Sequence, residues 1–340
     1  TKQREGTTVL KGMQRHLTRP QVQERGCTVL QMLQAHPTPR PFPVELGAVE
    51  VVVAAMQRHL SLVGLQQSAC GALRSLAQHV GYPDQIVEGG AMAQVLAAIQ
   101  RHPMHLGVQV QGCGALGSLV KRADVHHKAR IVEAGAFKVV LASIRQHSAC
   151  AVLQEQALTV LGHLSSERPL LQPLEGTEID GMVVDAMRSH PTDAAVQEHG
   201  SRIIGHLAVN VNLLTGLLDA GAVKAVLQAK KLPQWRVQEA GGQALRAMIA
   251  SASPHGAVSD SGILSRILST LQREGSALGK DAVPSAGGGL LPHLNSVQHN
   301  HSAPAAPATF FPPDVVDPSP SRLSPQLQQL LGSPAPRSGG

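Results

Sequence analysis

The sequence predicts an all-α protein built as a linear array of helical repeats. Three observations support this: one segment recurs at a nearly constant interval, its apolar residues follow helical spacing, and aromatic side chains are scarce. Hydrophobic residues make up 43% of the 340 residues and aromatic residues only 2%, so Leu, Val, Ile, Ala and Met must form the core. This composition favours helices over sheets.

The recurring segment is twelve residues long, with apolar residues at its first, ninth and twelfth places. Its copies begin at Val22, Leu65, Val108, Leu153, Val196 and Val237. Successive starts are 43, 43, 45, 43 and 41 residues apart, a period typical of stacked units of two or three helices. The apolar places form one stripe of a helix.

The fifth place of the segment always holds a small residue, which predicts close approach of a neighbouring helix. The six residues are Gly26, Ala69, Gly112, Ala157, Gly200 and Gly241. Gly inside a helix costs about 1 kcal/mol relative to Ala, so its recurrence indicates a packing requirement.

A second set of segments precedes these, and each is expected to form one amphipathic helix that starts at a glycine after a sharp bend. The glycines are Gly47, Gly90, Gly135, Gly181 and Gly221. Short apolar stretches upstream, such as residues 85–88 and 213–218, predict a short first helix. Each unit is therefore expected to contain a short helix, a Gly bend, a longer helix, a loop and a third helix.

Three regions follow from this pattern. Residues 1–250 are predicted to form the array, as a partial first unit and about five further units. Residues 251–275 are predicted to hold a capping helix that starts near Ser261 and closes near Gly275, because a terminal repeat exposes an apolar edge. Residues 276–340 are rich in Gly, Ser, Pro and Ala, which predicts a disordered tail.

The tail contains two short patterns. Ser319, Ser324 and Ser333 each precede a proline and are candidate phosphorylation sites. Residues 327–331 resemble the LxxLL box that docks on nuclear-receptor grooves. Both patterns are short, and Ser-Pro pairs are expected in a tail of this composition.

Cysteine and histidine recur with the array. Cys27, Cys70 and Cys113 are 43 residues apart, a repeat position that predicts small core side chains rather than a disulfide or zinc pattern. The histidines that close the second helices are His16, His59, His102, His147 and His190. One per unit is too widely spaced to hold one metal ion, so we expect them to interact with the carbonyl groups and dipole at their own helix ends.

The charge and the apolar pattern of the chain limit the classes of function that it can have. The chain has 29 basic and 23 acidic residues, a formal charge of +6 and a pI near 9.4, which is only a thin basic excess. It contains no run of about 18 apolar residues and no signal-peptide pattern, so an intracellular protein, cytoplasmic or nuclear, is expected. The first residue is Thr1 and not Met, as expected for a piece of a longer protein.

The motifs of common enzymes are missing from the sequence. There is no phosphate loop, zinc-protease helix, nucleophile elbow or paired CxxC. We therefore expect no catalytic residues, no metal ligands and no cofactor.

Several bends resemble those of armadillo repeats, as in importin-α and β-catenin. The segments are residues 85–91 (QIVEGGA), 130–136 (RIVEAGA) and 219–223 (DAGAV), and the resemblance covers roughly residues 1–250. It implies a right-handed superhelix whose third helices line a concave groove that holds an extended peptide or another protein.

Importin-like units carry a Trp and, four residues later, an Asn on the third helix, and this chain lacks both. The Trp place holds Thr28, Gly71, Gly114, Thr159, Arg202 and Gln243. The Asn place holds Met32, Ser75, Ser118, His163, His206 and Ala247. This absence argues against an importin-like cargo receptor.

A polar groove remains as the candidate binding site. The residues expected along it are Arg74, Ser75, Ser118, His163, Arg202, His206 and Arg246. A line of such donors suits carboxylates, phosphates or peptide carbonyls, although a solvated polar face is the alternative.

The sequence therefore favours a non-enzymatic scaffold or adaptor that binds a protein or an extended peptide in the groove. Binding of RNA is the alternative, since helical repeats can read RNA, but one Trp, one Tyr and four Phe offer few stacking surfaces. The partner's identity and the oligomeric state are not determined by the sequence.

Overall fold

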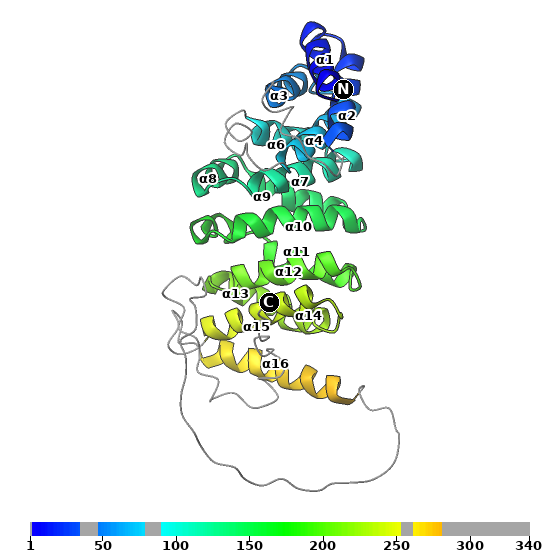
Figure 1. Cartoon of the computed structure of the whole chain (residues 1–340). Helices are drawn as coiled ribbons and strands as arrows, with labels where there is room; N and C mark the ends of the chain where they lie inside the picture. The colour runs from blue at the N-terminus through cyan, green and yellow to red at the C-terminus, as the bar shows by residue number, and fades with distance from the viewer. Residues whose placement is uncertain (1, 35–46, 79–89, 253–260, 281–340) are drawn as a thin grey trace, which may run out of the picture.

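The computed structural model describes residues 2–34, 47–78, 90–252 and 261–280. These residues form one elongated stack of helices that runs from α1 to α16 (Figure 1). The described residues contain no strand, and the protein is an all-α solenoid as predicted.

The third helices of the units form one layer of the stack, in which each helix packs against the next. They are α2 (Pro20–Gln34), α4 (Val63–Ala77), α7 (Leu106–Val120), α10 (Ala151–Ser165), α12 (Ala194–Leu207) and α15 (Trp235–Ala252).

The second helices form the adjoining layer, and each packs on the third helix of its own unit. They are α1 (Lys2–Arg15), α3 (Ala48–Arg58), α6 (Ala91–Arg101), α9 (Ala136–Gln146), α11 (Ile179–Ser189) and α14 (Ala222–Ala229). Short first helices precede two of them: α8 (Val125–Glu133) and α13 (Val211–Asp219).

The apolar stripes predicted from the sequence form a continuous core between the two layers. Leu65, Leu73 and Leu76 of α4 have no exposed surface. The fifth-place glycines meet the second helix of their own unit: a Cβ on Gly112 would lie 2.6 Å from Ile99 Cγ1. The packing reason predicted for the small residues is therefore confirmed.

The glycine bends follow the prediction at four of the five positions. Gly47, Gly90, Gly135 and Gly221 precede their second helices with φ values of 72°, 75°, 91° and 82°, a left-handed conformation in which glycine avoids the strain of a Cβ.

The prediction is wrong for Gly181, which lies inside α11. In this unit two 3₁₀ turns, η1 (Arg168–Leu170) and η2 (Gln172–Leu174), replace the first helix. Each contains a proline near its start. The positive φ moves to Gly176, at 76°.

A glutamine at the second place closes the second helix of the same unit in the first five segments, whereas Gln238 of the sixth donates to Leu232 beyond α14. Gln66 Nε2 donates to the carbonyl oxygens of Met56 (2.9 Å) and His59 (3.0 Å). Gln23, Gln109, Gln154 and Gln197 make the same pair of bonds in their units. Because these side chains are buried, they satisfy carbonyl groups that a helix end leaves open.

The recurring histidines link successive units, which corrects the expectation that they interact with their own helix ends. The Nε2 atom of His102 lies 2.8 Å from the carbonyl oxygen of Leu60 in the preceding unit. His59, His147 and His190 make the equivalent contact with Leu17, Pro103 and Ser148. Glutamine already bonds the carbonyl groups at their own helix ends, and the rings contact the loop of the preceding unit.

The recurring cysteines lie in the core, as predicted. Cys27, Cys70 and Cys113 are buried, and no cysteine forms a disulfide. Burial raises the pKa of Cys27 and of Cys113 to about 12, with Glu24 adding to the effect at Cys27. These thiols stay protonated and act as small apolar side chains.

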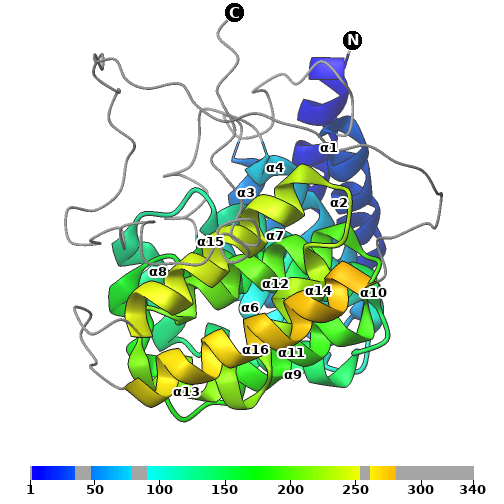
Figure 2. The ribbon, with the colours of Figure 1, turned by 90° about the horizontal axis from the view of Figure 1, so that it is seen from below.

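The final helix, α16 (Ser261–Lys280), packs on α13, α14 and α15 at the end of the stack (Figure 2). Ile263, Ile267 and Leu271 are buried in this contact. The predicted end near Gly275 is wrong, because the helix continues to Lys280; one Gly inside a helix costs only about 1 kcal/mol. The tail patterns at Ser319, Ser324, Ser333 and residues 327–331 lie outside the described residues.

Candidate partner-binding groove

A groove of about 820 Å³ crosses the third helices from α4 to α15. Its floor comes from the seventh and eleventh places of the segments, which the resemblance assigns to the binding face. Gly114, Thr159, Arg202 and Gln243 come from the seventh place. Gly114 and Gly117 of α7 also line the groove, and the Arg74 guanidinium occupies the space beside Gly114.

Three of the seven candidate residues line this groove: Ser118, His163 and Arg202. The other four lie outside its lining. Arg74 crosses onto α7, where its guanidinium lies beside Gly114, and Ser75 is half-buried on α4. His206 Nδ1 lies 3.1 Å from Ser165 Oγ, and Arg246 is exposed on α15. A role in binding stays a prediction for all seven.

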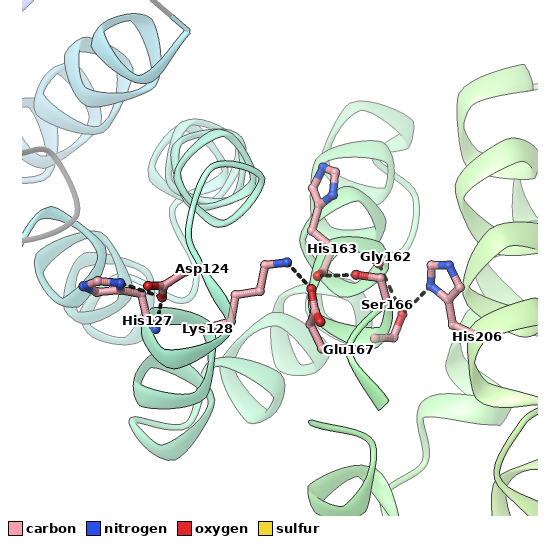
Figure 3. A network of polar contacts seen from close by, with 9 residues as sticks. Asp124, His127, Lys128, Gly162, His163, Ser166, Glu167 and His206 are labelled. Atoms are coloured by element: carbon pink, nitrogen blue, oxygen red, sulfur yellow. Dashed lines mark hydrogen bonds and ion pairs between the residues drawn. The ribbon is translucent and has the colours of Figure 1, made fainter. Parts of the chain in front are cut away.

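Cationic side chains gather at the C-terminal end of α7. Lys121 and Arg122 both line the groove, and Arg122 Nη2 donates to the carbonyl oxygen of Gln78 at 2.9 Å. Nearby, Lys128 of α8 is nearly buried and its Nζ lies 2.6 Å from Glu167 Oε1 (Figure 3). Lys128 is thereby neutralised, whereas the bond of Arg122 leaves its charge unmatched.

Three carboxylates line the opposite, N-terminal part of the groove. Glu155, Glu198 and Glu239 occupy the third place on α10, α12 and α15. Glu198 pairs with Arg202 at 2.6 Å across one helical turn. These carboxylates and the Lys121–Arg122 pair are not among the residues predicted from the sequence, although Glu recurs at the third place of the last three segments.

Three histidines stand at or beside the groove, and each has a lowered pKa. For His163, burial is the main cause, and the positive charges of Lys121, Lys128 and Arg202 add to it, so the pKa is about 4. Burial and Arg202 also lower the pKa of His199 and His206. Figure 3 shows the His163 ring pointing away from the Lys128–Glu167 pair. These rings are therefore neutral at pH 7, and each has one nitrogen that donates a hydrogen bond and one that accepts.

An exposed aromatic ring stands at the α15 end of the groove. Trp235 lines it with 66% of its surface exposed. The guanidinium of Arg236 lies over the ring, 5.5 Å from its centroid. Exposed Trp is enriched among residues that dominate binding energy at interfaces.

The arrangement suits recognition of a polar chain by charges and hydrogen bonds. Among the described residues, no group of three His, Cys, Asp or Glu side chains could hold a metal ion. The part of the chain with described structure also has no helix that is both long and apolar enough for a membrane span.

Comparisons with known proteins identify the fold. A family model described as the LRRK2 ARM repeat matches residues 88–234. No curated protein matches the chain.

Solved structures with the same architecture include designed proteins. A designed armadillo repeat protein in complex with peptide (KR)4 is 16% identical, with a TM-score of 0.58 over 71% of this chain and 98% of that chain. Computationally designed armadillo repeat proteins for modular peptide recognition are 15% identical, with a TM-score of 0.60 and coverage of 71% and 98%. Another solved structure concerns a conserved phosphorylation switch that controls the interaction between cadherin and beta-catenin. It is 19% identical, with a TM-score of 0.61 over 79% of this chain and 52% of that chain.

Proposed function

We propose that this chain, an armadillo-type repeat solenoid, is a non-catalytic scaffold that binds an extended segment of a protein partner in the groove of its third helices. The observation that carries the proposal is the groove itself, which spans five third helices and carries charged groups along its length. A polar groove that crosses five helices fits an extended chain better than a compact small molecule.

The structural neighbours support binding of this kind in general. They include designed proteins for peptide recognition and a protein complex of the same architecture. The groove of this chain lacks the Trp and Asn places of importin-like units, since Thr159 and Arg202 stand where Trp would be. The partner is therefore not bound through Trp and Asn side chains as in importin-like units. It is bound through the groove side chains described above.

An intracellular location, in the cytoplasm or the nucleus, is part of the proposal. All four cysteines, which lie within the described residues, are free thiols. Free thiols are usual in reducing compartments, where disulfides are rare.

The test compares partners captured by the full chain with those captured by the charge-reversed variant Lys121→Glu/Arg122→Glu. The matched control is Arg130→Glu/Lys138→Glu, which reverses two exposed charges outside the groove lining. We expect the groove variant to capture about tenfold less of each nuclease-resistant protein partner. The reason is that the two rim charges together contribute on the order of 1 kcal/mol to binding. Equal capture by the groove variant, the control and the wild type would contradict the proposal.

Nucleic acid is the other outcome that this experiment can reveal. Binding through phosphates releases counterions and weakens steeply as salt rises. Partners that disappear after nuclease treatment, with such a salt dependence, would identify the groove as a nucleic-acid surface instead.

A further inference from the structure

The charges in the groove are unequally distributed between the two edges of the helix layer, although the cation of Arg236 lies at the same edge as the carboxylates. Lys121 and Arg122 stand at the α7 end, at the C-terminal edge of the helix layer. Glu155 and Glu239 stand at the opposite edge, on α10 and α15. Between them, Arg202 and Glu198 neutralise each other in an ion pair of 2.6 Å.

The positive end keeps an unmatched charge. Arg122 donates to a neutral carbonyl, that of Gln78, and no ion pair of Lys121 occurs among the described residues, where its side chain is exposed. The effect reaches the groove floor on α10, where Lys121 helps to lower the pKa of His163. Lys128 contributes to the same effect, but Glu167 already compensates its charge.

The negative end keeps unmatched carboxylates. Glu239 Oε1 accepts a hydrogen bond from the neutral amide of Gln243 at 3.3 Å. Glu155 has no ion pair within the described part of the chain, and its carboxylate lines the groove. Arg236 is a cation at this end, where its guanidinium lies over the Trp235 ring; it keeps its charge, so it offsets one of the two carboxylates.

The distance between the two ends sets the length of a ligand that reaches both. Lys121 and Glu155 lie eleven places apart in the segment register, about 16 Å along a helix axis. Adjacent helices add about 9 Å for each step across the layer. Glu155 is one step from α7 and Glu239 is three, so the separations are roughly 18 and 31 Å. An extended chain covers these with about six to nine residues.

We propose that the groove binds an extended peptide segment that carries an acidic cluster and a basic cluster about six to nine residues apart. The acidic cluster lies against Lys121 and Arg122, and the basic cluster lies against Glu155 and Glu239. This inference rests on the proposed function and names the chemistry of the partner. Complementary charges of this kind determine which partner is accepted and in which register.

The experiment uses four synthetic peptides and the full chain, with binding measured by fluorescence anisotropy. Two peptides contain four Glu and four Lys as separate blocks around a Gly-Ser-Gly spacer, one in each order, so that either chain direction is covered. In both, the block centres are seven residues apart, which is about 23 Å when extended. The third peptide has the same composition with Glu and Lys alternating, and the fourth has eight Lys around the same spacer.

We expect at least one block peptide to bind about tenfold more tightly than the alternating peptide, which has the same charge and composition. Lys121→Glu/Arg122→Glu should remove this advantage and strengthen binding of the all-Lys peptide. Glu155→Lys/Glu239→Lys should remove the advantage and weaken binding of the all-Lys peptide. The control Arg130→Glu/Lys138→Glu should preserve the wild-type order of affinities.

Three results would overturn the inference. They are equal binding of block and alternating peptides, a block preference that survives both groove variants, and no binding of any peptide at millimolar concentration. The partner-capture experiment separates these results from a failure of the proposed function. If Lys121→Glu/Arg122→Glu still loses protein partners while the peptides show no block preference, the groove is a docking site and only the charge arrangement inferred for its ligand is wrong.

Discussion

Histidine has two different roles in two regions of this molecule. At the edge where second and third helices meet, His102 is buried and bonded to a carbonyl of the preceding unit. On the groove, His163 lies half-buried, and burial together with neighbouring cations holds its pKa at about 4. The first position recurs in every unit from His59 to His190, whereas the second is His only on α10 and α12.

This difference separates the residues that build the array from those that give it an individual surface. The glutamine, histidine and glycine places recur in most units, where they close the second helix and contact the neighbouring unit. The groove places change from unit to unit, as in Gly114, Thr159 and Arg202 at the seventh place. We therefore expect substitutions at recurring places to change stability, and substitutions at groove places to change binding.

The largest stability effect should come from Gln109→Ala. Its amide donates to the carbonyl oxygens of Ile99 and His102, and its oxygen lies 2.6 Å from the Ser143 hydroxyl. Loss of these buried bonds should lower the free energy of unfolding by about 2–4 kcal/mol, measured by urea denaturation. Gln100→Ala, at an exposed position on α6, is the control and should change it by less than about 0.5 kcal/mol.

The next largest effect should come from the histidine contacts between units. His102→Ala should cost about 1–3 kcal/mol, because it removes a buried ring together with its hydrogen bond to the Leu60 carbonyl. His147→Ala should cost less, because that ring is half-exposed and water can replace it. Equal costs in urea denaturation would show that burial does not determine the strength of these contacts.

Gly135 and Gly181 provide a matched pair for the role of the bend. Neither has an atom within 4 Å of an added Cβ, but Gly135 has a φ of 91° and Gly181 lies inside a helix. Gly135→Ala should lower the free energy of unfolding by about 1–2 kcal/mol. Gly181→Ala should raise it by about 1 kcal/mol through helix propensity. In thermal unfolding, the melting temperature should fall for Gly135→Ala and rise for Gly181→Ala. A change in the same direction for both variants would contradict the assignment of the bend to Gly135.

The groove histidines should make stability depend on pH. The pKa of His163 is about 4 in the folded protein, below its ordinary value of 6.5, so the unfolded chain binds more protons between these values. Stability should therefore be full above pH 6.5 and fall as pH decreases toward 4. His199 and His206 act in the same direction. His163→Gln should reduce the slope in urea denaturation between pH 7 and pH 5, and an unchanged slope would count against this origin.

The smallest stability effect should come from the groove rim. Lys121→Glu/Arg122→Glu changes exposed or half-exposed side chains, so the free energy of unfolding should change by less than about 0.5 kcal/mol per residue. A larger loss would mean that the pair stabilises the array, and binding data on the variant would need a fold control.

Much of the array could be predicted from the sequence, because it depends on local spacing. The period placed all six third helices, and the small fifth-place residues indicated the contact that Gly112 makes with Ile99. The partners of the histidines could not be predicted, since His102 bonds to Leu60 across a unit boundary. The bend predicted at Gly181 lies at Gly176 instead, because 3₁₀ turns that contain Pro169 and Pro173 replace the first helix of this unit.

The groove could be predicted only in part. Ser118, His163 and Arg202, from the seventh and eleventh places, line the groove, and their role in binding stays a prediction. Lys121 and Arg122 lie after the end of their segment, and Glu155 lies at the third place of its own. They were not predicted, because the prediction used only the seventh and eleventh places. Their importance appears only when neighbouring helices bring them to opposite ends of one groove.

The sequence by itself determined the repeat, the all-α class and the buried stripe of each helix, because these follow from residue spacing along one helix. Tertiary structure decided which charges remain unmatched. Glu167 of one unit neutralises Lys128 of the preceding α8, whereas Lys121 and Glu155 keep their charges in the groove; the Glu198–Arg202 pair lies one turn apart on α12 and follows from spacing along one helix. The physical reason is that ion pairing depends on distances between atoms of different helices, and those distances are set by how the units stack.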